Sequence, residues 1–387
     1  MRILQVIEFF SPSMGGSAQV AHQTASHLAR RGHQVSVWSS DYGADGSRFP
    51  EGSFETVLFP CPLARWGFYP TPALAGWARR HVSEFDVIHL HNLRTFQNLA
   101  VAGAARRAGV PYVLSAHGSL PHLVERKGAK RVFDFLFGRR LIQDAQRLVA
   151  VSPAEAEQYH QAGVDEKRIE VVYNGLDLDE FADLPARGTF RRANAIAEGT
   201  RIVLYLGRLH KRKGIDVLIR AFGRIHNELE PCLLLIAGPD DGELARLQAL
   251  VGELGLGNWV RFTGPLYGEE KLSAYVDADV LASPAVHEIF GLVPFEALMC
   301  GTPVIVTDDC GSGRLILEAG VGYVVPVGDA KALAEQIVRA LTHREEAVRL
   351  AMNGQQFALQ SLDWEAIVPE YERMYRELVQ QTWSAQD

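Results

Sequence analysis

Two glutamates and the apolar run between them suggest chemistry in the stretch SPAVHEIFGLVPFEALMCGTPV, residues 283–304. Residues 292–299 predict one short buried helix, with Glu288 on the loop before it and Glu296 inside it. Gly291 permits close approach of the backbone at the start of this helix. The unpaired N–H groups and positive dipole end of a helix attract anions, so we predict an anion site beside a carboxylate. The alternative is one loop glutamate and one glutamate on a helix surface.

A group of cations lies in the loop GRLHKRKG, residues 207–214, between a predicted strand and a predicted helix. Arg208 and Lys213 are among them. Arginine can bind a diphosphate through two parallel hydrogen bonds, and lysine binds it as a point charge. A basic loop can also be merely solvated. Its place before a helix, in the half of the chain that carries the two glutamates, favours a diphosphate site.

Polar residues follow several predicted strands, where ligands of parallel sheets bind: His89, His91, His117 and Asn174. His117 is followed by a glycine and is the stronger functional candidate, whereas His89 and His91 are predicted to be structural histidines. We expect the side chains of His89 and His91 to point to opposite faces of their strand. No acidic residue accompanies them at metal-ligand spacing, so no metal site is predicted.

Short apolar runs alternate with helical patterns along the whole chain. The predicted strands are 3–7, 35–38, 86–90, 110–116, 147–151, 169–173, 202–206, 232–237, 260–263, 280–282 and 303–307. The predicted helices include 18–31, 95–108, 215–229 and 364–381, and residues 177–200 are predicted to be a linker. This alternation predicts an α/β protein with doubly wound parallel sheets. A length of 387 residues predicts two domains, which we place at 1–182 and 183–362, followed by a helix within 363–387.

Two segments of the first half offer further binding surfaces. Gly15 and Gly16 stand between the first strand and the first helix, where N–H groups can approach a phosphate or sugar, although a Gly-Gly pair is often only a turn. Residues 123–146 interleave basic and apolar side chains and predict either an amphipathic helix on anionic lipid or a buried helix with a solvated face. The aromatic segment 65–80 is expected to join the same face or an acceptor pocket.

Composition narrows the class of protein. Residues 1–182 carry 19 Lys and Arg against 18 Asp and Glu, a net of +1, and the remainder carries 20 against 28, or −8. A nucleic-acid partner is therefore not expected. Four scattered cysteines, an N-terminus that predicts a strand rather than a signal peptide, and no membrane-spanning apolar run predict a cytoplasmic protein. Association with the inner face of the plasma membrane is expected through residues 123–146.

Several segments occur in an order that is typical of one enzyme family: the GG loop, DVIHLHN, SAHG, VVYNGLD, GRLHKRKG and HEIFGLVPFEALMCGTPVI. The chain resembles the retaining glycosyltransferases of family 4 in the GT-B superfamily over nearly its whole length. The last segment matches the E-x7-E motif of that family and is the most specific. The resemblance implies two Rossmann-like domains facing a cleft, with a C-terminal helix that crosses back to the N-terminal domain.

The resemblance also implies a role for each matching residue. The N-terminal domain would bind the acceptor and the C-terminal domain a nucleotide-diphosphate sugar, with a UDP or GDP sugar expected. Donor diphosphate binding is implied for Gly16, Arg208, Lys213, Gly291, Leu292 and Val293. Glu296 and Gly264 would serve the nucleoside, and Glu288 and His117 the transferred sugar as catalytic residues. Gly15, His91 and Asn174 are assigned to the acceptor side.

Neither a cofactor nor a metal is expected, because no Asp-x-Asp motif is present and cations can stabilise the departing diphosphate. Without a second carboxylate nucleophile, retention suggests front-face attack by a hydroxyl of a glycan or lipid-linked acceptor in cell-surface polysaccharide synthesis. Arg314 stands where the family commonly has a glutamate. The resemblance therefore does not predict the structure of the donor-pocket rim at this position. The alternatives are a non-catalytic sugar-nucleotide-binding subunit and a nicotinamide-dependent oxidoreductase; the latter lacks its G-x-G-x-x-G fingerprint.

Overall fold

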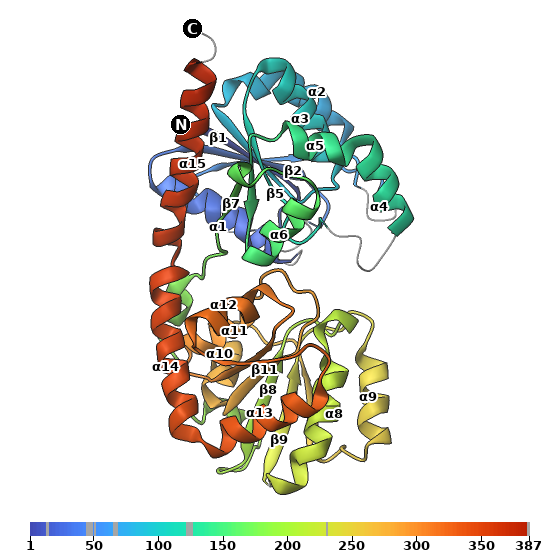
Figure 1. Ribbon diagram of the computed structural model, residues 1–387, viewed down its shortest axis with the longest axis vertical. Coiled ribbons are helices and arrows are strands. Elements are labelled where there is room, and N and C mark those ends of the chain that lie inside the picture. Colours follow the sequence, from blue (N-terminus) through green and yellow to red (C-terminus); the bar gives the residue numbers. More distant parts are fainter. Residues whose placement is uncertain are drawn as a thin grey trace. The chain divides into compact units, whose positions relative to one another are not determined.

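The computed structural model describes residues 1–12, 15–43, 49, 52–64, 69–120, 127–229 and 231–384. The chain divides into two compact units (Figure 1). The N-terminal unit comprises Met1–Gly175 and Trp364–Asp387, and the C-terminal unit comprises Leu176–Asp363. Parts of two predicted segments, residues 65–68 and 123–126, lie outside the described residues.

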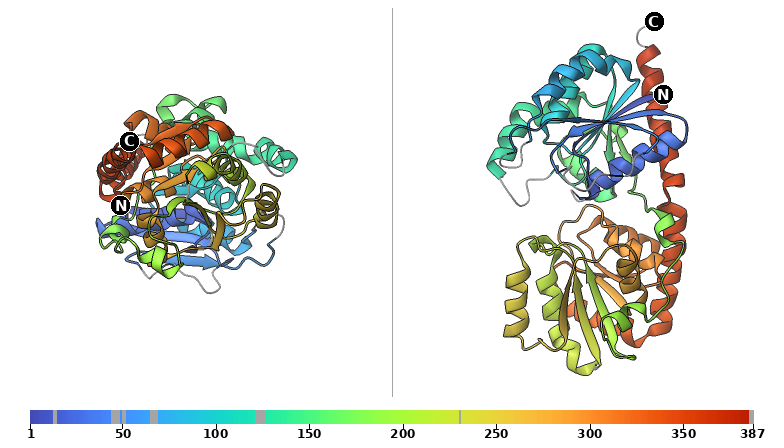
Figure 2. Two further views of the ribbon diagram at one scale, coloured as in Figure 1. Left: turned by 90° about the horizontal axis from the view of Figure 1, so that it is seen from below. Right: turned by 180° about the vertical axis from the view of Figure 1, so that it is seen from behind.

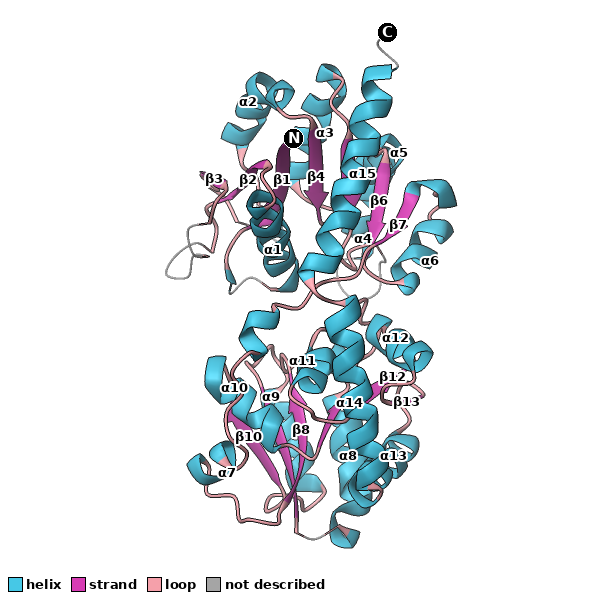
Figure 3. Cartoon of the chain, turned by 90° about the vertical axis from the view of Figure 1, so that its left-hand side faces the viewer, coloured by secondary structure: helices cyan, strands magenta, loops and turns pink. Residues whose placement is uncertain are grey.

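The N-terminal unit is built on a seven-stranded parallel sheet of order β3-β2-β1-β4-β5-β6-β7 (Figure 3). Its strands are β1 (Arg2–Phe9), β2 (Gln34–Ser40), β3 (Glu55–Phe59), β4 (Val87–His91), β5 (Tyr112–Ser115), β6 (Arg147–Ala150) and β7 (Ile169–Val171). Its helices are α1 (Gly16–Arg30), α2 (Pro72–His81), α3 (Phe96–Ala108), α4 (Lys127–Phe133), α5 (Arg139–Asp144), α6 (Pro153–Gln161) and α15 (Trp364–Ser384). The strand order reverses between β1 and β4, which is where such sheets bind ligands.

Alternation along the strands divides the core of this unit between two faces. Leu4 and Val6 of β1 join a cluster with residues of α2, α3, α5 and α6. Ile3 and Ile7 of the same strand join a second cluster with α1 and α15. Successive side chains of a strand point to opposite faces, so each helix layer receives every second residue.

The last helix, α15, returns to the N-terminal unit as predicted. Its Glu372 accepts from Arg31 Nε and His33 Nε2, each at 2.9 Å. Trp364 is buried and leaves no room beside Gly175, where an added Cβ would lie 2.6 Å from the indole ring. The buried apolar residues of α15 belong to the core cluster on one face of the sheet, and the right-hand view of Figure 2 shows the helix running alongside its unit.

The C-terminal unit contains a six-stranded parallel sheet of order β10-β9-β8-β11-β12-β13. Its strands are β8 (Arg201–Leu206), β9 (Cys232–Ala237), β10 (Val260–Gly264), β11 (Val280–Ser283), β12 (Val304–Thr307) and β13 (Tyr323–Val325). Its helices are α7 (Thr189–Ala193), α8 (Ile215–Ile225), α9 (Leu244–Glu253), α10 (Gly268–Asp277), α11 (Val293–Met299), α12 (Gly311–Ala319), α13 (Ala330–Thr342) and α14 (Arg344–Ser361). The two parallel Rossmann-like sheets confirm the predicted α/β class.

The prediction that residues 177–200 are a linker was wrong. They include the short helix α7, and Phe190 is buried in the C-terminal unit. The backbone N–H of Arg191 donates to Asp277 Oδ2 at 2.9 Å, which fixes the segment to α10. In the described part of segment 65–80, Trp77 packs against Phe59 and the core.

Candidate functional site

The basic loop and the loop of Glu288 meet at the carboxyl ends of two adjacent strands, β8 and β11. Lys213 lies in a 3₁₀ turn, Lys211–Lys213, and its ammonium donates to Glu288 Oε2. Only 23% and 25% of these two side chains are exposed. The sequence prediction of a cationic loop and a glutamate therefore corresponds to one ion pair within the C-terminal unit.

Close backbone packing makes this ion pair possible. Gly214 has a φ of +63°, and a Cβ there would lie 2.1 Å from the carbonyl oxygen of Pro284. The N–H of Val286 donates to the carbonyl of Arg212 at 2.7 Å. Because only glycine adopts this conformation at this distance without strain, the two loops are held in contact and Lys213 reaches Glu288.

Arg208 leaves the end of β8 and pairs with an acid of a neighbouring loop. Its Nη1 donates to Asp241 Oδ2 at 2.8 Å, and 58% of the arginine side chain is exposed. Tyr205 also donates its hydroxyl to the carbonyl of Arg208 at 3.0 Å. The structure therefore gives Arg208 a different carboxylate partner from that of Lys213.

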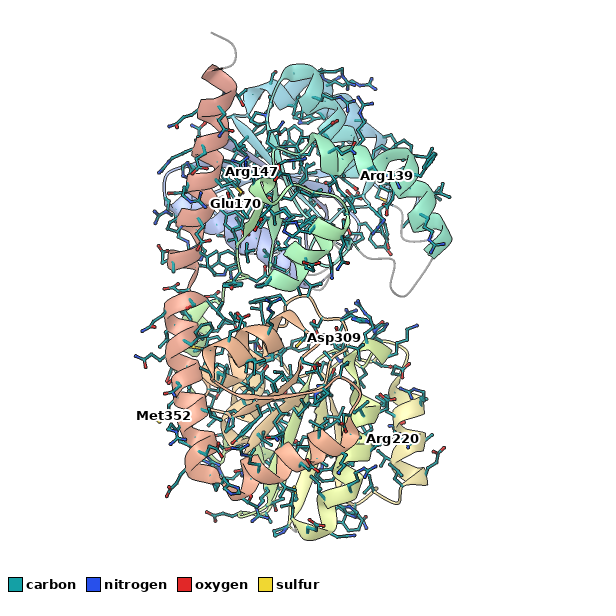
Figure 4. All side chains as sticks on the ribbon, in the orientation of Figure 1. Arg139, Arg147, Glu170, Arg220, Asp309 and Met352 are labelled. Atoms are coloured by element: carbon teal, nitrogen blue, oxygen red, sulfur yellow. The ribbon has the colours of Figure 1, made fainter. Side chains whose placement is uncertain are left out.

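The segment around Glu288 is anchored to the β12–α12 connection. Gly311 donates its N–H to the carbonyl of Glu288 at 2.8 Å. His287 has a φ of +52°, and its Nδ1 lies 2.7 Å from Oδ2 of Asp309 (labelled in Figure 4). Leu292 precedes α11 without a side-chain cap. These contacts fix the backbone around Glu288 and leave the N–H groups of the first turn of α11 without a capping side chain.

Glu296 is held by two residues of α10. Its Oε2 accepts from Tyr275 OH at 2.8 Å and lies 3.4 Å from Lys271 Nζ, which also bonds Glu180 at 3.1 Å. Burial alone lowers the pKa of the Lys271 ammonium, but the carboxylates of Glu296 and Glu180 raise it above its usual value. A charged Lys271 thus faces Glu296. Neither Tyr275 nor Lys271 was predicted as a partner of Glu296, although their spacing of four residues places them on one helix face.

Gly264 and Arg314 lie elsewhere in the C-terminal unit. Gly264 ends β10 with a φ of +77°, and its carbonyl accepts from the N–H of Gly238 at 2.8 Å. Arg314 Nε bonds Glu318 Oε1 at 3.0 Å within α12, and both side chains are more than half exposed. In this structure Arg314 therefore pairs with a glutamate of its own helix.

The three candidate histidines His89, His91 and His117 lie together in the N-terminal unit. His91 Nδ1 is 2.9 Å from His117 Nε2, and the rings of His89 and His91 stack at 4.2 Å. The expectation that His89 and His91 point to opposite faces was wrong, because the period of a strand is two and residues i and i+2 share a face. Within the described part of the chain, no group of three His, Cys, Asp or Glu side chains is arranged to hold a metal.

Burial keeps these histidines neutral. It lowers the pKa of His117 to about 4 and that of His89 to about 3, and it lowers the pKa of His91 well below its usual value. His89 lies between Tyr375 OH and Ser115 Oγ, each at 2.6 Å. His117 itself has a φ of +48° and is half-buried. At neutral pH each ring therefore has one nitrogen that donates and one that accepts.

The remaining candidates of the N-terminal unit surround the start of α1. Gly15 precedes the helix with a φ of +109°, and Gly16 is its first residue. Asn92 Nδ2 donates to Glu8 Oε2 at 3.2 Å and to Ser17 Oγ at 3.3 Å, which ties the end of β4 to this point. Burial raises the pKa of Glu8, which sequence analysis did not single out, to about 7.

Asn174 follows β7 and is buried, at 8% exposure. Its Oδ1 has no hydrogen-bond partner among the residues that the structure describes. Among the described residues, no hydrogen bond or ring contact joins Asn174 to the histidine group, so its assignment to the acceptor side stays a prediction.

Two family models match consecutive parts of the chain. Residues 14–180 match "Glycosyltransferase Family 4" and residues 186–357 match "Glycosyl transferases group 1". A D-inositol 3-phosphate glycosyltransferase of Corynebacterium urealyticum is 28% identical over 98% of this chain and 96% of its own. A phosphatidyl-myo-inositol mannosyltransferase of Mycobacterium leprae is 28% identical over 97% and 96%.

Solved structures share the fold over nearly the whole chain. Sucrose-phosphate synthase from Thermosynechococcus elongatus superposes with a TM-score of 0.79 at 24% identity, covering 97% of this chain and 98% of its own. Anabaena HepE in complex with UDP-glucose gives 0.74 at 23% identity, covering 100% and 99%. Together with the two family matches, these similarities show that the chain belongs to glycosyltransferase family 4, whose members are retaining, metal-independent enzymes that use a nucleotide-sugar donor.

Proposed function

We propose that the protein transfers a hexose from a UDP or GDP sugar to a hydroxyl of a glycan or lipid-linked acceptor in cell-surface polysaccharide synthesis. The observation that carries the donor assignment is the Lys213–Glu288 ion pair at the carboxyl ends of β8 and β11. It sets a cation for a departing diphosphate directly beside a carboxylate for the sugar. The relative named phosphatidyl-myo-inositol mannosyltransferase supports a lipid-linked acceptor.

Each donor residue has a distinct chemical task in this proposal. Arg208 exchanges Asp241 for a phosphate oxygen, and Lys213 neutralises the charge that develops on the leaving diphosphate. Glu296, which lies beside the charged Lys271, accepts from the ribose hydroxyls, and Gly264 lies at the nucleoside. Glu288 and His117 contact the transferred sugar. The acceptor hydroxyl attacks from the face that the diphosphate leaves, and the departing phosphate takes its proton.

A panel of UDP, GDP and ADP sugars in a thermal-shift assay tests the donor. A cognate donor at about a hundred times its Kd stabilises the folded protein by about 2.7 kcal/mol, and we expect one base to dominate the panel. Transfer to a lipid-linked or glycan acceptor with an anomerically retained product, measured by NMR, completes the test. Donor binding with neither sugar transfer nor hydrolysis of the donor would instead support a non-catalytic sugar-nucleotide-binding subunit.

Replacement of Gly291 by alanine is expected to separate donor binding from folding. A Cβ at this position meets Ser312 Oγ at 3.5 Å and Glu288 Cγ at 3.6 Å, which are ordinary contacts. The free energy of unfolding should change by less than about 0.5 kcal/mol. If N–H groups at Gly291, Leu292 and Val293 contact the diphosphate, the new methyl group should raise the Kd of the donor about tenfold or more.

The matched control is Gly252→Ala in α9, where a Cβ meets nothing within 4 Å. Urea unfolding and calorimetric donor titration of both variants give the two quantities. Unchanged donor affinity in a folded Gly291→Ala protein would remove this backbone segment from the diphosphate site.

The proposed membrane contact lies on α4, the π-helical turn Asp134–Gly138 and α5. Figure 1 shows α4 at the rim of its unit. Exposed apolar side chains lie beside exposed arginines on this segment: Val132, Phe135, Leu136 and Phe137 with Arg131, Arg139 and Arg140. Arg94 Nε donates to Asp134 Oδ1 at 2.8 Å and fixes the turn. Apolar side chains flanked by cations are suited to an anionic lipid surface.

Phe135→Ala is therefore expected to weaken binding to vesicles that contain anionic lipid. Phe135 is 75% exposed, and transfer of such a side chain into the membrane interface contributes about 1.5–3 kcal/mol, or about ten- to a hundredfold in the partition coefficient. Met352→Ala on α14, which is 64% exposed and labelled in Figure 4, is the control. Co-sedimentation that is equal for wild type and Phe135→Ala would contradict the assignment. Among the described residues, no helix is long and apolar enough to span a bilayer.

A further inference from the structure

A buried glutamine stands in the middle of the first strand, where an apolar residue would be expected. Gln5 is 0% exposed and lies on the same face of the sheet as Ile3 and Ile7. Its Oε1 lies 3.1 Å from Nε2 of His91. Its Nε2 has no hydrogen-bond partner in the described part of the chain. An unsatisfied buried donor costs free energy, and an aliphatic side chain would avoid this cost. The amide carbonyl, in contrast, supplies an acceptor to His91 that an aliphatic side chain cannot supply.

The hydrogen bonds that start at Gln5 determine which nitrogen of each ring carries the proton. The carbonyl oxygen of Gln5 only accepts, so His91 Nε2 carries a hydrogen and His91 Nδ1 is left with a lone pair. His117 Nε2 lies 2.9 Å from that lone pair and must therefore donate to it. Since burial keeps His117 neutral, its remaining nitrogen, Nδ1, has a lone pair. No described residue forms a hydrogen bond with that atom.

A second hydrogen-bonded series runs beside the first without sharing an atom with it. Tyr375 OH and Ser115 Oγ occupy the two nitrogens of His89, whose ring stacks on His91 at 4.2 Å. The stacked ring restrains the orientation of His91 but does not choose its tautomer. That choice belongs to Gln5.

We propose that Gln5 is a positioning residue that holds His117 in its Nε2–H tautomer through His91, so that His117 Nδ1 accepts a hydrogen bond from a hydroxyl of the transferred sugar. This inference rests on the proposed function of His117 and sharpens it to a substrate class. A lone pair accepts an O–H group but opposes a carboxylate oxygen. The enzyme therefore uses a neutral sugar with a hydroxyl at that position in preference to a uronic acid.

The proton position is measured first in the wild-type protein, without substrate. In protein labelled with ¹⁵N-histidine, long-range ¹H–¹⁵N spectra distinguish protonated from unprotonated ring nitrogens, and loss of one ring in His117→Asn assigns the signals. We expect a protonated Nε2 and an unprotonated Nδ1 for His117, and a scalar coupling between His117 Nε2 and His91 Nδ1 across the hydrogen bond. An Nδ1–H tautomer, which follows if the Gln5 amide is turned to donate to His91, would overturn the proposal.

Gln5→Met then removes the acceptor while keeping a straight side chain of similar volume. We expect His117 to populate both tautomers, kcat to fall about tenfold and the affinity for the free nucleoside diphosphate to remain unchanged. The preference for a neutral over a uronic-acid donor should narrow by a similar factor. Ser115→Ala, which alters the His89 series only, should leave the tautomer of His117 as in the wild type.

An unchanged His117 tautomer in folded Gln5→Met protein would refute the role of Gln5. If that variant does not fold, the wild-type spectrum still decides the direction of the hydrogen bonds. The role of Gln5 and the proposed function can fail separately. If His117 has the expected tautomer but the protein binds no sugar nucleotide, the hydrogen bonds from Gln5 through His91 to His117 are confirmed and the proposed function is refuted.

Discussion

Lys213→Ala is expected to lower kcat by about two to three orders of magnitude. The departing diphosphate gains negative charge in the transition state, and a fixed cation beside it lowers the barrier more than it strengthens ground-state binding. The donor Kd should rise much less than kcat falls. Roughly three quarters of each side chain of the Lys213–Glu288 pair is buried, so the alanine variant leaves the Glu288 carboxylate partly buried and unpaired. Urea unfolding of the variant, measured beside its kinetics, separates this loss of stability from the loss of kcat.

Lys211→Ala provides the matched control, since Lys211 lies in the same 3₁₀ turn and is exposed. It removes the same charge from the same loop without touching Glu288. Steady-state kinetics with the cognate donor and acceptor should show near-normal turnover for this variant. Similar losses in both variants would mean that the general positive potential of the loop matters, and that Lys213 has no specific role.

Glu288→Gln is expected to reduce kcat about a hundredfold or more while leaving donor affinity equal or slightly higher. The isosteric amide loses the negative charge that stabilises positive charge at the anomeric carbon as the bond to the diphosphate breaks. Lys213 also loses its intramolecular partner, so its charge is more available to the donor diphosphate. A falling kcat with an unchanged or falling KM is the signature of this combination.

The double variant tests whether the two residues act as a unit. Because Lys213 and Glu288 are in contact, their effects should be non-additive by about 0.5–3 kcal/mol in a double-mutant cycle of kcat. Glu318→Gln, which removes an exposed carboxylate that pairs with Arg314, is the control. Near-normal turnover of Glu288→Gln would remove Glu288 from the reaction, and strict additivity would separate the roles of the pair.

The central strands were predictable because strands buried on both faces form continuous apolar runs. The strand β8 and its neighbours β9 and β11 illustrate this. The prediction did not include β3, whose sequence ETVLF is mostly exposed or half-buried, or β13, which has three residues. Both are edge strands. Which of their residues are buried depends on the elements that pack against them. Phe190 was missed in the same way, since its burial depends on α10 rather than on its own neighbours in sequence.

The sequence predicts which charged and polar residues lie at the ends of strands. It does not predict which residues they pair with. Glu288 and Lys213 are 75 residues apart, and their contact depends on the approach of Gly214 to Pro284. Tyr275 and Lys271 reach Glu296 from another helix. Such contacts are properties of packing and leave only weak periodic signals in the sequence. The error about His89 and His91 had a different cause: the period of a strand already places them on one face.

The position of α15 determines the order in which the two units can be completed on the ribosome. The N-terminal unit has its sheet by Gly175 but needs the last helix, which begins at Trp364. At about 5–20 residues per second, synthesis of the intervening chain takes about 10–40 s. During that time the sheet lacks the cover supplied by Ile367, Tyr371 and Tyr375. The C-terminal unit, translated second, is therefore the first to be complete, and truncation of the final helix exposes the core of the other unit.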